Sequence, residues 1–310
     1  MPVMPSLRAR HLWLLLAPAA CAAGVWWQAR RPETAPTHVV AGVATPSVAT
    51  PVALAARASD GAQPATPVAV AAAVEAHPDL YRYAQQLQRQ VRAGDAQAGW
   101  RLSRVYDYCA PYAHSPAGYA ADSAWIASQH APGMAAMQAA RAQVARRCAG
   151  FAPSDGLGLA AVVQQRRAAA RAGSLAAEAA LLAQGEPLQR SEEYKRLLVQ
   201  RVLASRDPEA YLALAPAMGA RASGDDSLHG YVAGDQFAEL AWQVAACRLG
   251  LDCSAQSTLV TSYCANAGIC SRDRAQDFVS FVFDAAVPRQ GADKVDEMAE
   301  SLVSGSGAQS

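Results

Sequence analysis

The stretch LGLAAVVQQRRAAARAGSLAAEAALLAQG, residues 157–185, decides the fold class. Its apolar residues recur at the three- and four-residue spacing of a helix, and alanine, the best helix former, dominates it. Gly173 stands in the middle, where a glycine can end one helix as its C-cap and let a second begin. The stretch therefore predicts two short helices that pack as a close pair.

Helical patterns of the same kind continue along the chain from about residue 77. They cover residues 79–94, 96–110, 133–148, 191–206, 207–219, 235–250, 255–266 and 272–286. Ser191 is a favourable N-cap, and Asp207 followed by Pro208 is a strong helix start. No hairpin dipeptide between alternating strands appears. We therefore predict an all-α fold of nine to eleven short helices: an irregular array of antiparallel helix pairs, either solenoid-like or a bundle.

Composition limits the classes of protein to which this chain can belong. Its 310 residues are 52% hydrophobic and 17% charged, which is enough to build a core and too apolar for full disorder. The 27 Lys and Arg residues nearly balance the 26 Asp and Glu residues, for a net charge of +1. Composition therefore forces no basic face, and we expect no nucleic-acid partner. No apolar run is typical of a polytopic membrane protein.

The first 31 residues have the pattern of an export signal. Basic residues precede the apolar run LWLLLAPAACAAGVWW, residues 12–27. Three outcomes are open: cleavage after the small residues at 20–23, retention as a membrane anchor, or lipidation of Cys21. The run is slightly shorter than the roughly 20 residues of a usual span. We favour an anchored protein in the periplasm.

The rest of the chain divides by composition. Residues 32–76 are rich in Pro, Ala and Thr and sustain no helical or strand period, which predicts a semi-extended linker. Residues 77–290 form the predicted helical domain. A short helix and a disordered tail are expected over residues 291–310.

A degenerate repeat lies within the helical patterns. RAGDAQAGWRLSRVYDYC (92–109) and RAAARAGSLAAEAALLAQG (167–185) share a basic helix end, Ala-Gly, a polar residue, and then Ala and Leu at helix spacing. LASRDPEAYLALAPAMG (203–219) is a weaker copy. The pattern resembles the tetratricopeptide-like helical repeats of the SEL type, over residues 92–109 and 167–219. The resemblance implies stacked helix pairs with a concave surface for a partner. The matching positions are Ala93, Gly94, Ala96, Ala98, Leu102 and Tyr106 in the first copy, and Ala172, Gly173, Ala177 and Leu181 in the second.

Six cysteines follow the export signal, and an even number in that context indicates disulfides. They are Cys109, Cys148, Cys247, Cys253, Cys264 and Cys270. The last four form two Cys-x5-Cys units, each with a glycine that can reverse the chain between the two sulfurs. We favour the pairs 109–148, 247–253 and 264–270, with 253–264 as a rival among fifteen possible connectivities.

Sequence motifs for catalysis or cofactor binding are missing. We find no nucleophile elbow, phosphate loop, dinucleotide fingerprint or His-Glu-x-x-His. The five-residue gaps between cysteines fit structural zinc poorly. We expect no metal and no cofactor.

Two polar or aromatic segments remain as weak candidates for a site. GDDSLHGYVAGD (224–235) places Asp225 and Asp226 beside His229, which suits acid–base work or cation binding, although a solvated loop is the plainer reading. YDYCAPYAHSPAGY (106–119) is read as an aromatic loop that can grip a ligand or pack on its own helices. Its candidate binding residues are Tyr106, Tyr112 and Tyr119.

We therefore expect a non-catalytic envelope protein that binds another envelope protein through its helical array and the membrane through its N-terminal segment. The alternative is an envelope-acting hydrolase with its site in the 224–235 loop.

Overall fold

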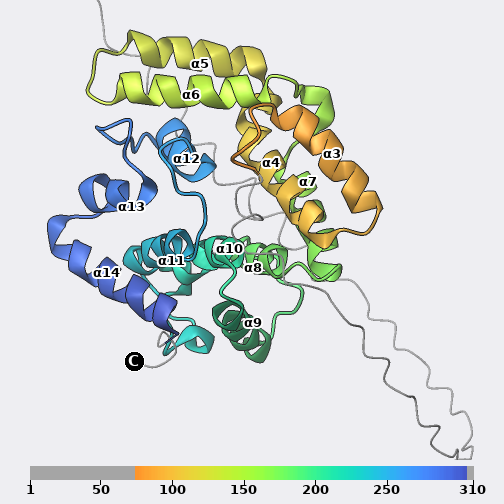
Figure 1. Cartoon of the computed structure of the whole chain (residues 1–310), viewed down its shortest axis with the longest axis vertical. Helices are drawn as coiled ribbons and strands as arrows, with labels where there is room; N and C mark the ends of the chain where they lie inside the picture. Colours follow the sequence, from red (N-terminus) through yellow and green to blue (C-terminus); the bar gives the residue numbers. More distant parts are fainter. Residues whose placement is uncertain (1–73, 306–310) are drawn as a thin grey trace, which may run out of the picture. The chain divides into compact units, whose positions relative to one another are not determined.

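The computed structural model describes residues 74–305, and that part is entirely helical (Figure 1). Twelve α-helices and no strand occur in it, which confirms the predicted all-α class. The helices are α3 (Leu80–Arg92), α4 (Ala96–His114), α5 (Pro116–Ser128), α6 (Met134–Cys148), α7 (Leu159–Arg171), α8 (Leu175–Ala183), α9 (Glu192–Ser205), α10 (Pro208–Met218), α11 (Gln236–Arg248), α12 (Thr258–Ala267), α13 (Phe278–Phe281) and α14 (Arg289–Ser304). None of these helices is both long enough and apolar enough to cross a bilayer.

Part of the sequence prediction falls outside this description. The predicted signal or anchor of residues 1–31, with Cys21, lies outside the described residues, as does the linker up to residue 73. The linker was expected to run to residue 76, but Val74 is only 1% exposed and the Glu75 side chain is 6% exposed. These two residues therefore belong to the helical domain.

Seven helices pack one on the next in the order α3, α4, α7, α8, α10, α11 and α14 (Figure 1). The other helices flank this row. The hairpin of α5 and α6 contacts α4, α9 contacts α8 and α10, α12 packs on α6, and α13 contacts α11. These contacts join the seven helices into one row.

The α3–α4 and α7–α8 turns use the same backbone device. Gly94 and Gly173 follow the first helix of each pair with φ of +91° and +103°, where a side chain would be strained. In each turn, the glycine amide and the next amide donate back to carbonyls of the last helical turn. The residue after the glycine then caps the second helix, through the Asp95 carboxylate or the Ser174 hydroxyl. This local chemistry explains why the two stretches look alike in sequence.

Two clusters of buried side chains form the core. The larger is built mainly by α7 to α14, with Tyr211 and Trp242 fully buried in it. The smaller is built by α3, α4 and α6, with Leu87 among its buried residues. Trp100 of α4 belongs to the larger cluster and Ala265 of α12 to the smaller. The two clusters therefore meet where α4 and α12 lie, and the candidate site is at that junction.

Two parts of the chain differ from the sequence prediction. Residues 106–119, read as an aromatic loop, are helical: they span the end of α4 and the start of α5. Ser115 caps α5 and Pro116 occupies its first position, a combination that starts helices. The C-terminal helix α14 is 16 residues long rather than short, and begins before residue 291. It is held by burial of Val295, Ala299 and Leu302 against the larger cluster.

Three cysteine pairs lie at disulfide distance in the described chain, and they are the pairs that the spacing favoured. The Cα atoms are 5.5 Å apart in Cys109–Cys148, 5.6 Å apart in Cys247–Cys253 and 4.4 Å apart in Cys264–Cys270. The first ties α4 to α6, whereas each of the other two closes the turn that follows a helix end.

Candidate functional site

The buried guanidinium of Arg104 in α4 lies where the two core clusters meet. Its side chain is 10% exposed, and its Nη1 is 2.6 Å from Oε1 of Glu209 in α10. Its Nη2 is 3.3 Å from Oε1 of Glu75 and donates a hydrogen bond of 3.0 Å to the hydroxyl of Thr258. A buried charge is costly unless it is paired and hydrogen-bonded. Here, two carboxylates and one hydroxyl meet that requirement.

Glu209 is also held by the indole of Trp100, whose Nε1 donates to Oε2 at 3.1 Å. Burial raises the pKa of Glu209, and the attraction of Arg104 together with the Trp100 hydrogen bond opposes that rise. Burial acts to lower the pKa of Arg104, but Glu209 and Glu75 outweigh it and the pKa is raised. Arg104 therefore stays a cation, and Glu209 is its closest counter-ion.

Glu75 connects the start of the described chain to this network. Its carboxylate accepts from both the amide and the hydroxyl of Thr258, at 2.8 Å and 2.6 Å, and so caps the first turn of α12. Arg147 of α6 approaches the same carboxylate at 3.8 Å and donates to the Val74 carbonyl at 2.6 Å. The segment before α3 is thereby fixed to α4, α6 and α12.

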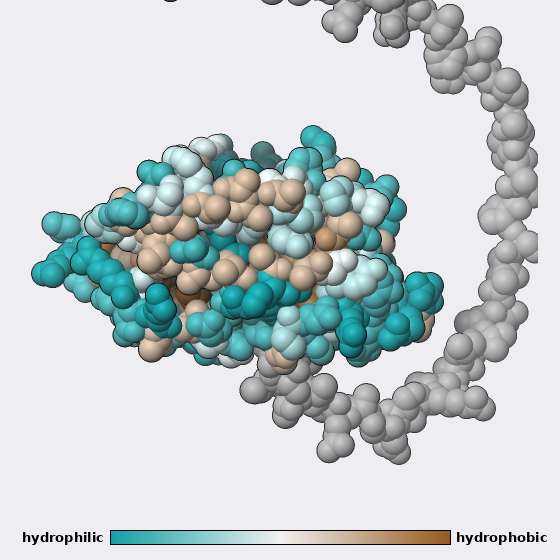
Figure 2. Space-filling model, turned by 90° about the horizontal axis from the view of Figure 1, so that it is seen from above, coloured by the Kyte–Doolittle hydropathy of each residue, from teal (hydrophilic) through white to brown (hydrophobic). Residues whose placement is uncertain are grey.

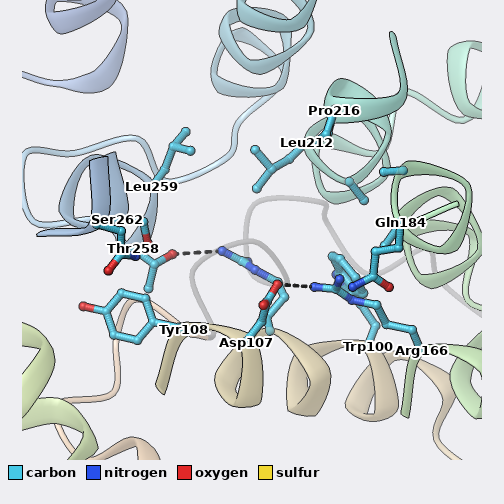
Figure 3. A pocket seen from close by; sticks show the side chains of 15 residues that line it. Trp100, Asp107, Tyr108, Arg166, Gln184, Leu212, Pro216, Thr258, Leu259 and Ser262 are labelled. Atoms are coloured by element: carbon cyan, nitrogen blue, oxygen red, sulfur yellow. Dashed lines mark hydrogen bonds and ion pairs between the residues drawn. The ribbon is translucent and has the colours of Figure 1, made fainter. Parts of the chain in front are cut away.

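A cavity of about 450 Å³ opens beside this network, between α4, α7, α8, α10 and α12 (Figure 3). We call it the cleft. Asp107 and Arg166 lie on one side of it in Figure 3, whereas Leu212, Pro216 and Leu259 lie on the other side. Arg104 also lines the cleft. Its remaining lining residues are Trp100, Tyr108, Ala180, Ala183, Gln184, Ala213, Thr258, Ser262 and Asn266. The volume lies in the range of small-molecule and peptide side-chain sites.

The polar side of the cleft is built around Arg166 of α7. Its Nη2 lies 2.7 Å from the Asp107 carboxylate, and its guanidinium carbon is 5.6 Å from the Trp100 ring centroid, within cation–π reach. Its Nε has no hydrogen-bond partner within residues 74–305, although the residue is only 7% exposed. The side-chain oxygen of Gln184 and the hydroxyl of Tyr108 are two more buried atoms of the cleft lining without a partner in the described chain. Buried polar groups are normally satisfied, so these three atoms need an explanation.

The lining of the cleft includes no histidine, cysteine or lysine. Its carboxylate, Asp107, is paired with Arg166, and its hydroxyl groups come from Tyr108, Thr258 and Ser262. Burial raises the pKa of Tyr108 to about 12, so its phenol stays protonated. Within residues 74–305, no group of three or more His, Cys, Asp or Glu residues is arranged to hold a metal ion.

The segment 224–235 is structural in its local contacts. The Asp225 carboxylate lies 2.5 Å from the Lys195 ammonium and accepts from the Ser227 amide, which caps a short helical turn. Burial alone would raise the pKa of Asp225, but the hydrogen bonds from Lys195 and Ser227 outweigh it and lower the pKa. Asp226 and His229 are exposed. The structure gives Asp225 a lysine partner and a capping role.

The three candidate tyrosines lie in helices α4 and α5 and pack against other rings. The Tyr119 ring is buried under the Arg141 guanidinium at 3.8 Å and meets Tyr112 edge to face. The Tyr106 hydroxyl accepts a hydrogen bond from Gln88. None of these tyrosines lines the cleft. Residues that sequence reasoning missed occupy it instead, and no local pattern marks them, because they come from five helices.

The α5–α6 hairpin presents a second surface of interest. An apolar band crosses the face in Figure 2, which looks down on the hairpin. The α5 helix has one charged residue, Asp122, and its Trp125 is 65% exposed. Exposed apolar patches often mark contact sites. The cleft is the better candidate, because it also offers polar groups that select a ligand.

No family model, no curated protein and no solved structure matches this chain.

Proposed function

We propose that the helical domain is a non-catalytic module that binds a segment of another protein in the cleft. The cleft's two-sided lining carries the proposal: charged and amide groups from α4, α7 and α8 face the apolar residues Leu212, Pro216 and Leu259. A polypeptide has the same dual character, since every backbone unit is polar and many side chains are apolar. Arrays of helix pairs present such concave sites for peptides and helices.

We also propose that the protein is exported and held at the membrane by its N-terminal segment, so that its partner is another envelope protein. The three disulfide pairs support this, because disulfides persist in oxidising compartments. The degenerate repeat supports a kinship with SEL-type helix pairs. Its two best copies, 92–109 and 167–185, share the same glycine turn.

Site-specific photocrosslinking in the native envelope tests the proposal. A benzophenone amino acid replaces Leu259 in the cleft or, as a matched control, Leu197, an exposed leucine of α9 outside the cleft. We expect one discrete partner adduct from position 259 and none of that mass from position 197. Pro216→Asp, at an exposed position of the cleft, should remove the adduct while leaving the melting temperature nearly unchanged.

The result also separates binding from misfolding. Leu212→Asp is a second cleft variant, and Leu197→Asp repeats the charge change away from the cleft. An adduct that survives both cleft variants, or equal adducts from positions 259 and 197, would refute a partner site in the cleft.

A further inference from the structure

The charges around the cleft are already balanced within the protein. Arg104 pairs with Glu209 and Glu75, Arg147 approaches Glu75, and Arg166 pairs with Asp107. Each of these three guanidiniums therefore has a carboxylate within 4 Å. An anionic ligand would have to displace one of these carboxylates, and a cationic ligand would have to displace a guanidinium. Electrostatics thus favours a ligand without net charge at the point of contact.

Two groups near each other in the cleft lining, one donor and one acceptor, are available for hydrogen bonds to a ligand. Arg166 offers one donor, its Nε–H, and Gln184 offers one acceptor, its side-chain oxygen; both are buried and have no partner within residues 74–305. Each residue lines the cleft. The Tyr108 hydroxyl is also buried without a partner in the described chain, but Figure 3 shows it on the opposite side of the cleft from Arg166 and Gln184. A complementary ligand must supply an acceptor and a donor together.

We propose that the cleft recognises a neutral polypeptide segment through its backbone. A carbonyl of the segment accepts from the Arg166 Nε–H, an N–H of the segment donates to the Gln184 oxygen, and apolar side chains rest on Leu212 and Leu259. Gln184 is the C-cap residue of α8 and is half-buried, whereas Arg166 is buried. We therefore expect the Gln184 side chain, and not that of Arg166, to rotate when the segment binds. This inference rests on the proposed function and specifies the ligand class of the same site.

The probe is a capped tripeptide, N-acetyl-Ala-Leu-Ala-amide, which carries backbone amides and an apolar side chain but no charge. It is titrated into the full-length oxidised protein in detergent, with Leu methyl groups observed by NMR. We expect saturable shifts of the Leu212 and Leu259 methyls. Inorganic phosphate and N-acetylglutamate, at the same concentrations, should leave these signals in place.

Two variants test the assigned atoms. Arg166→Lys keeps a cation for Asp107 but removes the Nε–H, and should weaken tripeptide binding about tenfold to a hundredfold, the range for hydrogen bonds to charged groups. Gln184→Leu should weaken it about twofold to tenfold. Arg167→Lys is the matched control, because Arg167 is the next residue of α7, pairs with Glu186 and does not line the cleft. It should leave the affinity unchanged.

Three outcomes would overturn the inference: phosphate or N-acetylglutamate shifting the cleft methyls more than the tripeptide does, no tripeptide binding, or unchanged affinity in Arg166→Lys. The photocrosslinking result shows whether the proposed function falls as well. If the adduct from position 259 still depends on Pro216 while the tripeptide fails, the cleft binds a partner by other chemistry. If that dependence is also absent, both proposals fail together.

Discussion

Neutralising one carboxylate of the buried network should destabilise the whole helical domain. Glu209→Gln keeps the side-chain shape, and its amide oxygen can still accept from Trp100. Arg104, however, then loses its counter-ion at 2.6 Å and keeps only Glu75 at 3.3 Å. Arg147 also draws on Glu75, at 3.8 Å. In the parent, the two guanidiniums are balanced by two carboxylates; in Glu209→Gln, only one carboxylate remains for both. All of these side chains are no more than 10% exposed.

Removing one partner of a buried ion pair costs about 3–5 kcal/mol, because the remaining charge stays buried without compensation. We expect about 3 kcal/mol here, at the lower end, since Glu75 and Thr258 still contact Arg104. For a domain of this size, that loss corresponds to a fall in melting temperature of about 6–12 °C. It is also a large fraction of the roughly 5–15 kcal/mol that stabilises most domains.

Urea unfolding of the oxidised full-length protein in detergent, followed by circular dichroism and tryptophan fluorescence together, measures the loss. Glu297→Gln, which neutralises an exposed carboxylate of α14, is the control and should stay within about 0.5 kcal/mol of the parent. Arg104→Met completes a double-mutant cycle. In the double variant, Glu209→Gln with Arg104→Met, Glu75 again balances Arg147. Its loss in free energy of unfolding should therefore be smaller than the sum of the two single losses by about 2 kcal/mol or more. A Glu209→Gln loss under about 1 kcal/mol, or strict additivity, would refute the reasoning.

Three further predictions use other parts of the chain. Cys109→Ala with Cys148→Ala opens a bridge with a sequence separation of 39 residues, and should lower the free energy of unfolding by about 4 kcal/mol, measured by urea unfolding. The lowered pKa of Asp225 means that its pairing with Lys195 stabilises the fold above the unfolded-state pKa and is lost as pH falls through the folded-state pKa. Hence, the stability difference between the parent and Asp225→Asn, measured by thermal melts, should shrink towards zero in acid. Tyr108, with a pKa raised to about 12, should ionise only above pH 10 while folded, so a Tyr108→Phe variant should lose no ultraviolet phenolate signal between about pH 9 and 10.5.

The local turns were predictable because their chemistry is local. A glycine after a helix end, followed by the capping residue Asp95 or Ser174, is enough to end one helix and start the next. The same logic applies to α5. Ser115-Pro116 repeats the cap-and-proline signal that starts the helix after Asp207, although the tyrosines and Pro111 around it are also typical of a loop. Pro111 is accommodated inside α4 instead.

The network was beyond reach of sequence patterns for a physical reason. Glu75 and Glu209 lie 29 and 105 residues from Arg104, and only the packing of the two core clusters brings them together. Nothing in the neighbourhood of Arg104 distinguishes it from arginines on solvated helix faces. A buried arginine can be predicted from the sequence only when its acidic partner is close in the chain, for example three or four residues away on the same helix. The cleft, which takes its lining from five helices, is hidden for the same reason.

Glu75 gives these long-range contacts a consequence for the site. The residue lies close to the start of the described chain, and its carboxylate accepts from the amide and hydroxyl of Thr258, the first residue of α12. Helix α12 carries Thr258, Leu259 and Ser262 on the cleft wall. The segment before α3 and one wall of the cleft therefore share a single carboxylate. If that segment merely rested on the surface, Glu75→Gln would leave the cleft untouched. Because the carboxylate holds the first turn of α12, the same change should displace that wall as well as weaken the domain.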